Sequence, residues 1–167
     1  MKKNFFTKSI LSLLVIGGIA FTNVSCEEEP KEKENTSNSS DEVSKYQEKF
    51  NSLMKENMEV HDEVMPKMTT LNSLLTTVEA SDTMDEELQQ ELIAKMKDAH
   101  SHMMSWMKSL SANFTREEVK GKIATEDIEE LKLKLAKLEE SYKDAQEMSK
   151  KFNKSIEEAE AAIADLR

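Results

Sequence analysis

Three long stretches of the chain repeat an apolar residue every three or four positions, and this spacing leaves little choice of fold. The repeat places the apolar side chains in one stripe along an α-helix. It runs through residues 41–79, through 84–112 and, most regularly, through 125–166. The 167 residues include only three glycines, so the chain has few of the turns that a β-fold needs. We therefore expect an all-α protein, an antiparallel three-helix bundle of long, coiled-coil-like helices.

Each expected helix has its own stripe of apolar side chains. The first stripe consists of Val43, Tyr46, Phe50, Leu53, Val60, Val64, Leu71, Leu74 and Val78, with Asn57 and Lys67 in the two remaining positions of the register. The second consists of Leu88, Leu92, Met96, Ala99, Met103, Trp106 and Leu110. The third consists of Ile128, Leu131, Leu135, Leu138, Tyr142, Ala145, Phe152, Ile156, Ala159, Ile163 and Leu166. These residues are the expected core.

The sequence also marks where the helices begin and break. Pro66 lacks a backbone donor, so it should kink the first helix or divide it near Val64. Asp82 and Asp85 are alternative N-caps of the second helix, and Thr125 is the expected N-cap of the third.

The segment 113–124, between the second and third helices, is expected to be a loop with at most one short turn. Thr115 and Glu118 have the spacing of a capping box, which favours such a turn. Gly121 interrupts any longer helix.

Residues 1–25 resemble a bacterial lipoprotein signal peptide that is removed from the mature protein. Lys2 and Lys3 precede an apolar run over 10–21, which is too short to span a bilayer as a helix. The single cysteine, Cys26, follows where a signal peptidase would cut. The resemblance implies that its thiol receives a diacylglycerol and that its amine is then acylated, with palmitate among the acyl chains. The alternative is an ordinary secretory peptide with an incidental cysteine.

Residues 26–40 contain many charged and small polar residues, which is typical of a disordered acidic and polar tether. No segment after it is apolar enough to enter a bilayer, so membrane contact is expected through the lipid on Cys26 alone. Glu27, Glu28 and Glu29 resemble the surface-export signal of Bacteroidota lipoproteins, or they simply begin a solvated linker. The expected location is the outer membrane of a bacterial cell envelope, on its outer face in the first case.

The charge and the reactive residues exclude several classes of protein. The chain has a net charge of -10, and removal of residues 1–25, which hold three of the 23 basic and none of the 33 acidic residues, leaves -13. Such an acidic surface argues against nucleic-acid binding. One cysteine allows no internal disulfide, and the sequence has no HExxH or CxxC motif for zinc. We expect a protein that is not an enzyme.

Methionine and histidine cluster on two of the expected helices. On the first, Met54, Met58, His61, Met65 and Met68 step by four or three residues, and on the second Met96, His100, Met103 and Met107 do the same. A hairpin that turns near residues 81–84 would bring together His61, Met65, His100, Met103 and Trp106. Thioether and imidazole ligands suit Cu(I), and a His/Met pair suits haem. The alternative is that methionine is the adaptable filler of a structural core.

Two segments resemble a known family. The run from His61 to Met68, which contains Pro66, and the run from Met103 to Met107 are similar to small helical lipoproteins of Bacteroidota, often labelled "viral A-type inclusion protein". The resemblance implies an envelope lipoprotein of unknown role, with no catalytic residue to carry over.

The same two motifs have a physical interpretation. Pro66 fixes a bend between Met65 and Met68, and the facing motif supplies Trp106 with Met104 and Met107 beside it. This arrangement predicts either a rigid structural corner or the lining of a small apolar pocket.

Together these observations predict a non-enzymatic envelope lipoprotein whose helices form a structural or protein-interaction module. The alternative function is the binding of a soft metal or haem by the methionine and histidine layer. Because the first and third helices outlast the second, a homodimer is the alternative to a monomer.

Overall fold

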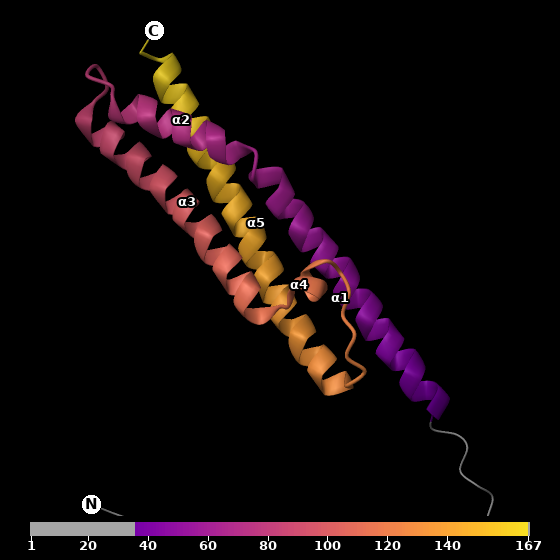
Figure 1. The fold of residues 1–167 in the computed structure, drawn as a ribbon. Helices are drawn as coiled ribbons and strands as arrows, with labels where there is room; N and C mark the ends of the chain where they lie inside the picture. Colours follow the sequence, from indigo (N-terminus) through magenta and orange to yellow (C-terminus); the bar gives the residue numbers. More distant parts are fainter. Residues whose placement is uncertain (1–35, 167) are drawn as a thin grey trace, which may run out of the picture. The chain divides into compact units, whose positions relative to one another are not determined.

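The structure, a computed structural model, describes residues 36–166, which form helices and their connections without any strand (Figure 1). The helices are α1 (Thr36–Val64), α2 (Lys67–Glu79), α3 (Glu86–Asn113), α4 (Arg116–Val119) and α5 (Ile128–Ala164). The prediction of an all-α helical bundle is confirmed. Cys26, the signal peptide and residues 27–35 of the expected tether lie outside the described residues. Residues 36–40 of the expected tether belong to α1, so the first helix begins earlier than predicted.

The longest helix, α5, organises the packing of the others. It packs against α1, α2 and α3, while α2 also packs against α3 and α4 against α1. In Figure 1, α1 and α2 follow one another in nearly the same direction and α3 returns alongside α5. The elements therefore alternate in direction as the sequence predicted, with α1 and α2 together in the place of the first helix.

The core is built mainly from the predicted stripes. The side chains that are essentially inaccessible to solvent include Trp106, Phe50, Phe152, Met54, Leu71, Leu92, Met96, Met103, Leu131, Leu138, Met148 and Val64. Leu88 and Leu166 were expected in the core, but both are exposed, so the prediction was wrong for these two residues. Leu88 lies in the first turn of α3 and Leu166 lies beyond the end of α5, and helix ends have fewer neighbours to cover them.

The breaks between helices follow the local chemistry of their residues. Helix α1 ends at Val64 and α2 begins at Lys67, so Pro66 divides the first expected helix. Asp85 is the N-cap of α3, and its carboxylate accepts a hydrogen bond from the Leu88 N–H at 3.1 Å. This confirms one of the two alternatives for the cap.

The expected cap of the last helix was wrong. Asp127, and not Thr125, is the N-cap of α5, where its carboxylate accepts from the N–H groups of Glu129 and Glu130. Thr125 lies two residues earlier, and its hydroxyl donates to the Glu130 carboxylate at 2.6 Å. An aspartate adds the favourable interaction of a negative charge with the helix N-terminus, which threonine does not supply.

The connection between α3 and α5 is an ordered segment that includes the expected short turn. Thr115 and Glu118 form both hydrogen bonds of a capping box at the start of α4. Phe114 and Ile123 are buried against the core, and Phe114 meets Phe50 edge to face at 5.8 Å. Gly121 has φ of +73°, a conformation that side chains with a Cβ rarely adopt.

None of the helices in residues 36–166 combines the length and the apolar character that a membrane crossing requires.

Candidate functional site

The centre of the bundle holds an aromatic pair that joins α1 to α3. The rings of His61 and Trp106 are stacked, with 5.7 Å between centroids and 26° between planes. Trp106 is 1 % exposed, and its indole N–H donates to the backbone oxygen of Ser141 on α5 at 3.0 Å. Trp106 is therefore held by α1 through its face and by α5 through its polar edge.

His61 has one satisfied ring nitrogen and one that has no partner. Its Nδ1 lies 2.9 Å from Oδ1 of Asp62, and because a carboxylate only accepts, the ring donates there. In the neutral ring Nε2 then keeps an available lone pair. This Nε2 is buried and has no hydrogen-bond partner. A buried nitrogen without a partner is uncommon in proteins and calls for an explanation.

The predicted metal ligands do not all gather around this nitrogen. Met65 is 46 % exposed, one helical turn along α1 from His61, whereas Met103 is buried in the core. His100 is half-buried and lies six residues, about 9 Å along the axis of α3, from Trp106. The structure thus brings His61 to Trp106 and places His100 at a different level of the bundle.

The third histidine faces another helix. His102 Nε2 lies 2.7 Å from Oδ1 of Asp144 on α5, and its buried Nδ1 has no partner. Sequence reasoning missed this pair, because the two residues are 42 positions apart and nothing local links them. The three histidines therefore do not form one layer.

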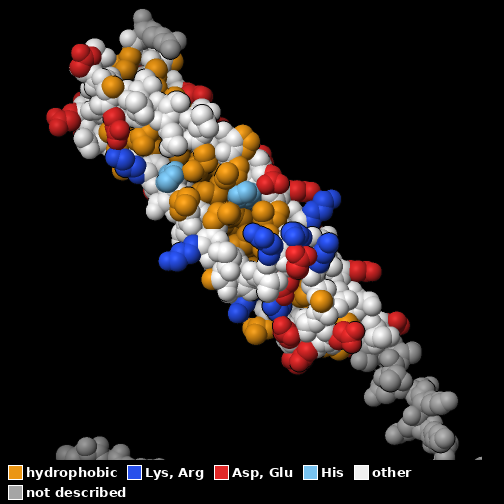
Figure 2. All heavy atoms as spheres, viewed as in Figure 1, with side chains coloured by type: hydrophobic (Ala, Val, Ile, Leu, Met, Phe, Trp, Pro, Cys, Tyr) orange, Lys and Arg blue, Asp and Glu red, His pale blue; other side chains and the backbone are white. Residues whose placement is uncertain are grey.

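Exposed methionines lie on the same helical faces as His61 and His100. We define the methionine face as two sets of three residues, each spaced by four and then three positions. The first set is His61 in α1, Met65 at the break and Met68 in α2, and the second is His100, Met104 and Met107 in α3. Met104 is 56 % exposed and Met107 is 37 % exposed, and the other members except Met65 are half-buried. Figure 2 shows histidine side chains among hydrophobic ones on the face in view.

Pro66, also part of the predicted motif, is exposed at the break between α1 and α2. The motif containing Pro66, Met68, Met104, Trp106 and Met107 therefore forms a bend beside an exposed face.

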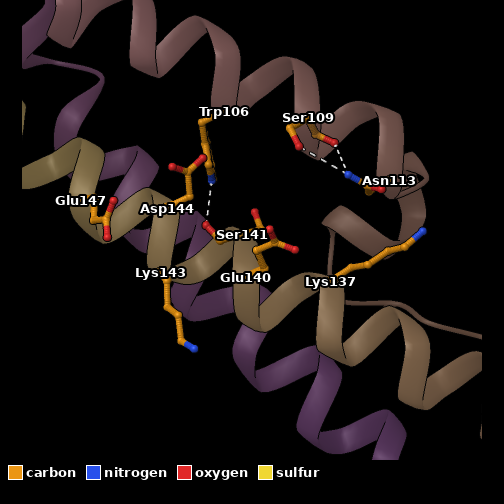
Figure 3. A pocket seen from close by; sticks show the side chains of 9 residues that line it. All are labelled: Trp106, Ser109, Asn113, Lys137, Glu140, Ser141, Lys143, Asp144 and Glu147. Atoms are coloured by element: carbon orange, nitrogen blue, oxygen red, sulfur yellow. Dashed lines mark hydrogen bonds between the residues drawn. The ribbon is translucent and has the colours of Figure 1, made fainter. Parts of the chain in front are cut away.

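A separate pocket of about 610 Å³ lies between α3 and α5, with Trp106 in its lining (Figure 3). Lysines, acids and small polar residues dominate its lining: Ser109, Asn113, Lys137, Glu140, Ser141, Lys143, Asp144 and Glu147, with Trp106 as the aromatic member. Neither His61 nor any methionine lines it, so the pocket does not offer haem the His/Met pair that the sequence suggested.

Where the pKa of a described group is clearly displaced, the displacement favours the charged form. The hydrogen bond from Lys151 lowers the pKa of Asp98, and the hydrogen bond to Glu158 raises the pKa of Lys95. Burial raises the pKa of Glu118, but hydrogen bonds from Lys134 and from Thr115 outweigh it and leave that pKa lowered. These groups are ion-pair partners, and none of them is tuned toward neutrality as an acid–base catalyst would be.

Among residues 36–166, histidine, cysteine and carboxylate side chains form no group of three or more that could hold a metal ion. That set of donors does not include the thioether sulfurs of methionine.

Comparison with family models, with curated proteins and with solved structures finds no match to this chain. The resemblance to the Bacteroidota lipoprotein family therefore stays a prediction from the two sequence motifs.

Proposed function

We propose that the protein is a non-enzymatic lipoprotein of the bacterial outer membrane, attached through Cys26, whose helical bundle binds another envelope protein through the methionine face. The attachment is supported by the sequence pattern around Cys26, which lies outside the described residues. The binding role is supported by the exposure of Met65, Met104 and Met107.

The methionine face is the observation that carries the binding role. Most apolar side chains of the described bundle are buried in its core, yet three unbranched thioether side chains remain exposed next to the half-buried Met68. Methionine has three rotatable bonds and a polarisable sulfur, so a methionine-rich surface adapts to the apolar side chains of a partner. Acidic and basic groups that form ion pairs elsewhere on the helices keep the remaining surface well hydrated.

The direction of the pKa shifts supports the non-enzymatic part of this proposal. The displaced pKa values of Asp98, Glu117, Glu118 and Glu158 are all lowered, and those of Lys95 and Lys132 are raised. General acid–base catalysis needs displacement in the opposite direction, toward the working pH.

Photo-crosslinking in cells that express the full lipoprotein tests the binding role. A crosslinking residue at position 104 is expected to capture a specific protein, and the charged double variant Met65→Glu/Met107→Glu is expected to abolish that capture. Leu133 on α5 is the matched control, because it is an exposed apolar residue outside the methionine face. Equal capture from positions 104 and 133, or capture that survives the double variant, would contradict the proposal. Capture of a second copy of the chain would show that the partner is the protein itself and that it forms a homodimer.

Metabolic labelling with a palmitate analogue tests the anchor separately. The wild-type chain is expected to incorporate the label and to fractionate with membranes, and Cys26→Ser is expected to lose both properties. Labelling that persists in the Cys26→Ser chain would contradict attachment at this residue.

A further inference from the structure

The methionine face contains a buried nitrogen ligand as well as sulfur. His61 Nε2 is buried without a hydrogen-bond partner, although the opposite nitrogen of the ring is bound to Asp62. Histidines that ligate metals characteristically donate their other N–H to a carboxylate, which fixes the tautomer and the orientation of the ring. His61 thus has the hydrogen bonding of a metal ligand, with its free lone pair directed into the protein.

Helical spacing identifies two partly exposed thioethers one turn or less from the aromatic pair. The stacking of His61 on Trp106 sets these two residues at a similar level of the antiparallel helices. Met65 directly follows the end of α1 and its N–H donates to the His61 carbonyl at 2.9 Å, and Met107 directly follows Trp106. Both side chains are partly exposed, so they can rotate toward His61 without leaving a cavity in the core. Met103 is buried against the core and His100 lies about 9 Å farther along α3, so we do not include them.

We propose that His61 Nε2, the Met65 sulfur and the Met107 sulfur form a binding site for a single Cu(I) ion. One imidazole and two thioethers are neutral, soft ligands that favour Cu(I) over hard divalent cations. Trp106 is stacked on His61 with 5.7 Å between the ring centroids, so its fluorescence serves as a reporter of an ion bound to His61. This site goes beyond the proposed protein-binding role and does not depend on it.

The test is a competition titration of the full chain in detergent with Cu(I) under reducing conditions, with Trp106 fluorescence as the signal. The chain carries Cys26→Ser, so that no free thiol competes for the metal. One equivalent of Cu(I) is expected to bind with a sub-micromolar Kd and to quench the single tryptophan. His61→Asn and Met65→Leu/Met107→Leu are each expected to weaken binding at least about tenfold, and Asp62→Asn by about tenfold through loss of the support to the ring.

Two variants serve as matched controls. His102→Asn removes the other half-buried histidine that pairs with an aspartate, and Met104→Leu removes the most exposed thioether of the methionine face. Both are expected to keep the wild-type affinity, and circular dichroism of each variant checks that the helices are intact. Wild-type affinity in a folded His61→Asn chain, or no binding by the parent chain, would overturn the Cu(I) site. Neither result would affect the crosslinking test of the protein-binding role.

Discussion

At the scale of single residues, Trp106 is a side chain that joins three helices. It contacts His61 of α1 through its ring, donates to the Ser141 carbonyl of α5 and itself belongs to α3. One side chain thus joins the three long helices at a common level. The indole also lines the polar pocket between α3 and α5.

We expect Trp106→Ala to lower the free energy of unfolding by about 3–5 kcal/mol, because it removes a fully buried aromatic ring and leaves a cavity. Urea denaturation followed by circular dichroism measures the change. Leu133→Ala, which truncates an exposed apolar residue on α5, should change stability by less than about 0.5 kcal/mol. Similar losses in the two variants would contradict the central role of Trp106.

Asn57 is a polar residue in a core position. Its amide nitrogen donates to the Ser141 hydroxyl at 3.2 Å, while its buried Oδ1 has no partner. Because a buried polar atom without a partner is destabilising, Asn57→Leu is expected to raise the free energy of unfolding by about 1 kcal/mol. Asn153→Leu is the control, since the Asn153 amide oxygen accepts from Lys67 at 2.8 Å and its loss should bring no gain. Thermal denaturation measures the stability of both variants. An Asn57→Leu chain less stable than the wild type would contradict the expected gain and show that the Asn57 amide stabilises the fold.

The sequence predicted most buried residues but not their partners. The repeat of three and four residues identified Phe50, Trp106 and Phe152 as core, because burial of a helical stripe depends only on local spacing. Met54 looked like part of the methionine cluster but is buried in the core. The contacts of His61 and His102 depend on how the helices align, which no local pattern encodes.

At the scale of elements, the breaks in the chain were predicted better than its caps. Pro66 ends a helix through the geometry of its own ring, so the break could be predicted from this residue alone. At the start of α5 the sequence predicted Thr125 as the cap, whereas Asp127 is the cap in the structure. Gln47 of α1 donates to the Thr125 carbonyl at 2.9 Å, which holds this residue in the connection before α5.

The connection after α4 depends on one glycine. Gly121 has φ of +73°, and a Cβ built there would meet the Asn51 carbonyl oxygen at 3.7 Å, an ordinary contact. We therefore expect Gly121→Ala to cost roughly 1–2 kcal/mol through backbone strain alone. Gly121→Asn should recover part of this loss, because asparagine tolerates the left-handed conformation better than alanine does. Chemical denaturation measures both variants, and an alanine variant as stable as the wild type would contradict the strain.

At the scale of the whole molecule, ion pairs between helices connect elements that are distant in sequence. Lys49 pairs with Glu139, Lys95 with Glu158, and Lys151 with Asp98. Another pair, between Lys134 and Glu118, ties α4 to α5 at 2.7 Å. The exposed pairs contribute little individually, whereas Glu118 is buried. The effect of these pairs is measured as a dependence of stability on pH.

We expect the free energy of unfolding to fall as the pH drops from about 5 toward 3. A carboxylate whose pKa is lowered in the folded state stabilises the fold above its unfolded pKa, and this contribution is lost as the pH falls through the folded pKa. Glu118 is such a group, since its bonds to Lys134 and Thr115 outweigh its burial. Glu118→Gln should flatten the acid side of the stability profile, whereas Glu126→Gln, at an exposed position, should not. Parallel profiles for wild type and Glu118→Gln would contradict this assignment.

The packing of α1 along α5 has a mechanical consequence for a protein tethered as proposed. Tension from an anchor at Cys26 would enter the bundle at Thr36, the first residue of α1. A partner held on the methionine face would resist farther along the same helix. The load would then run along the axis of α1, and the part that α3 carries through Met104 and Met107 would pass through α5, on which both helices pack, so that many side-chain contacts share it. The bundle would therefore transmit force between membrane and partner before it unfolds.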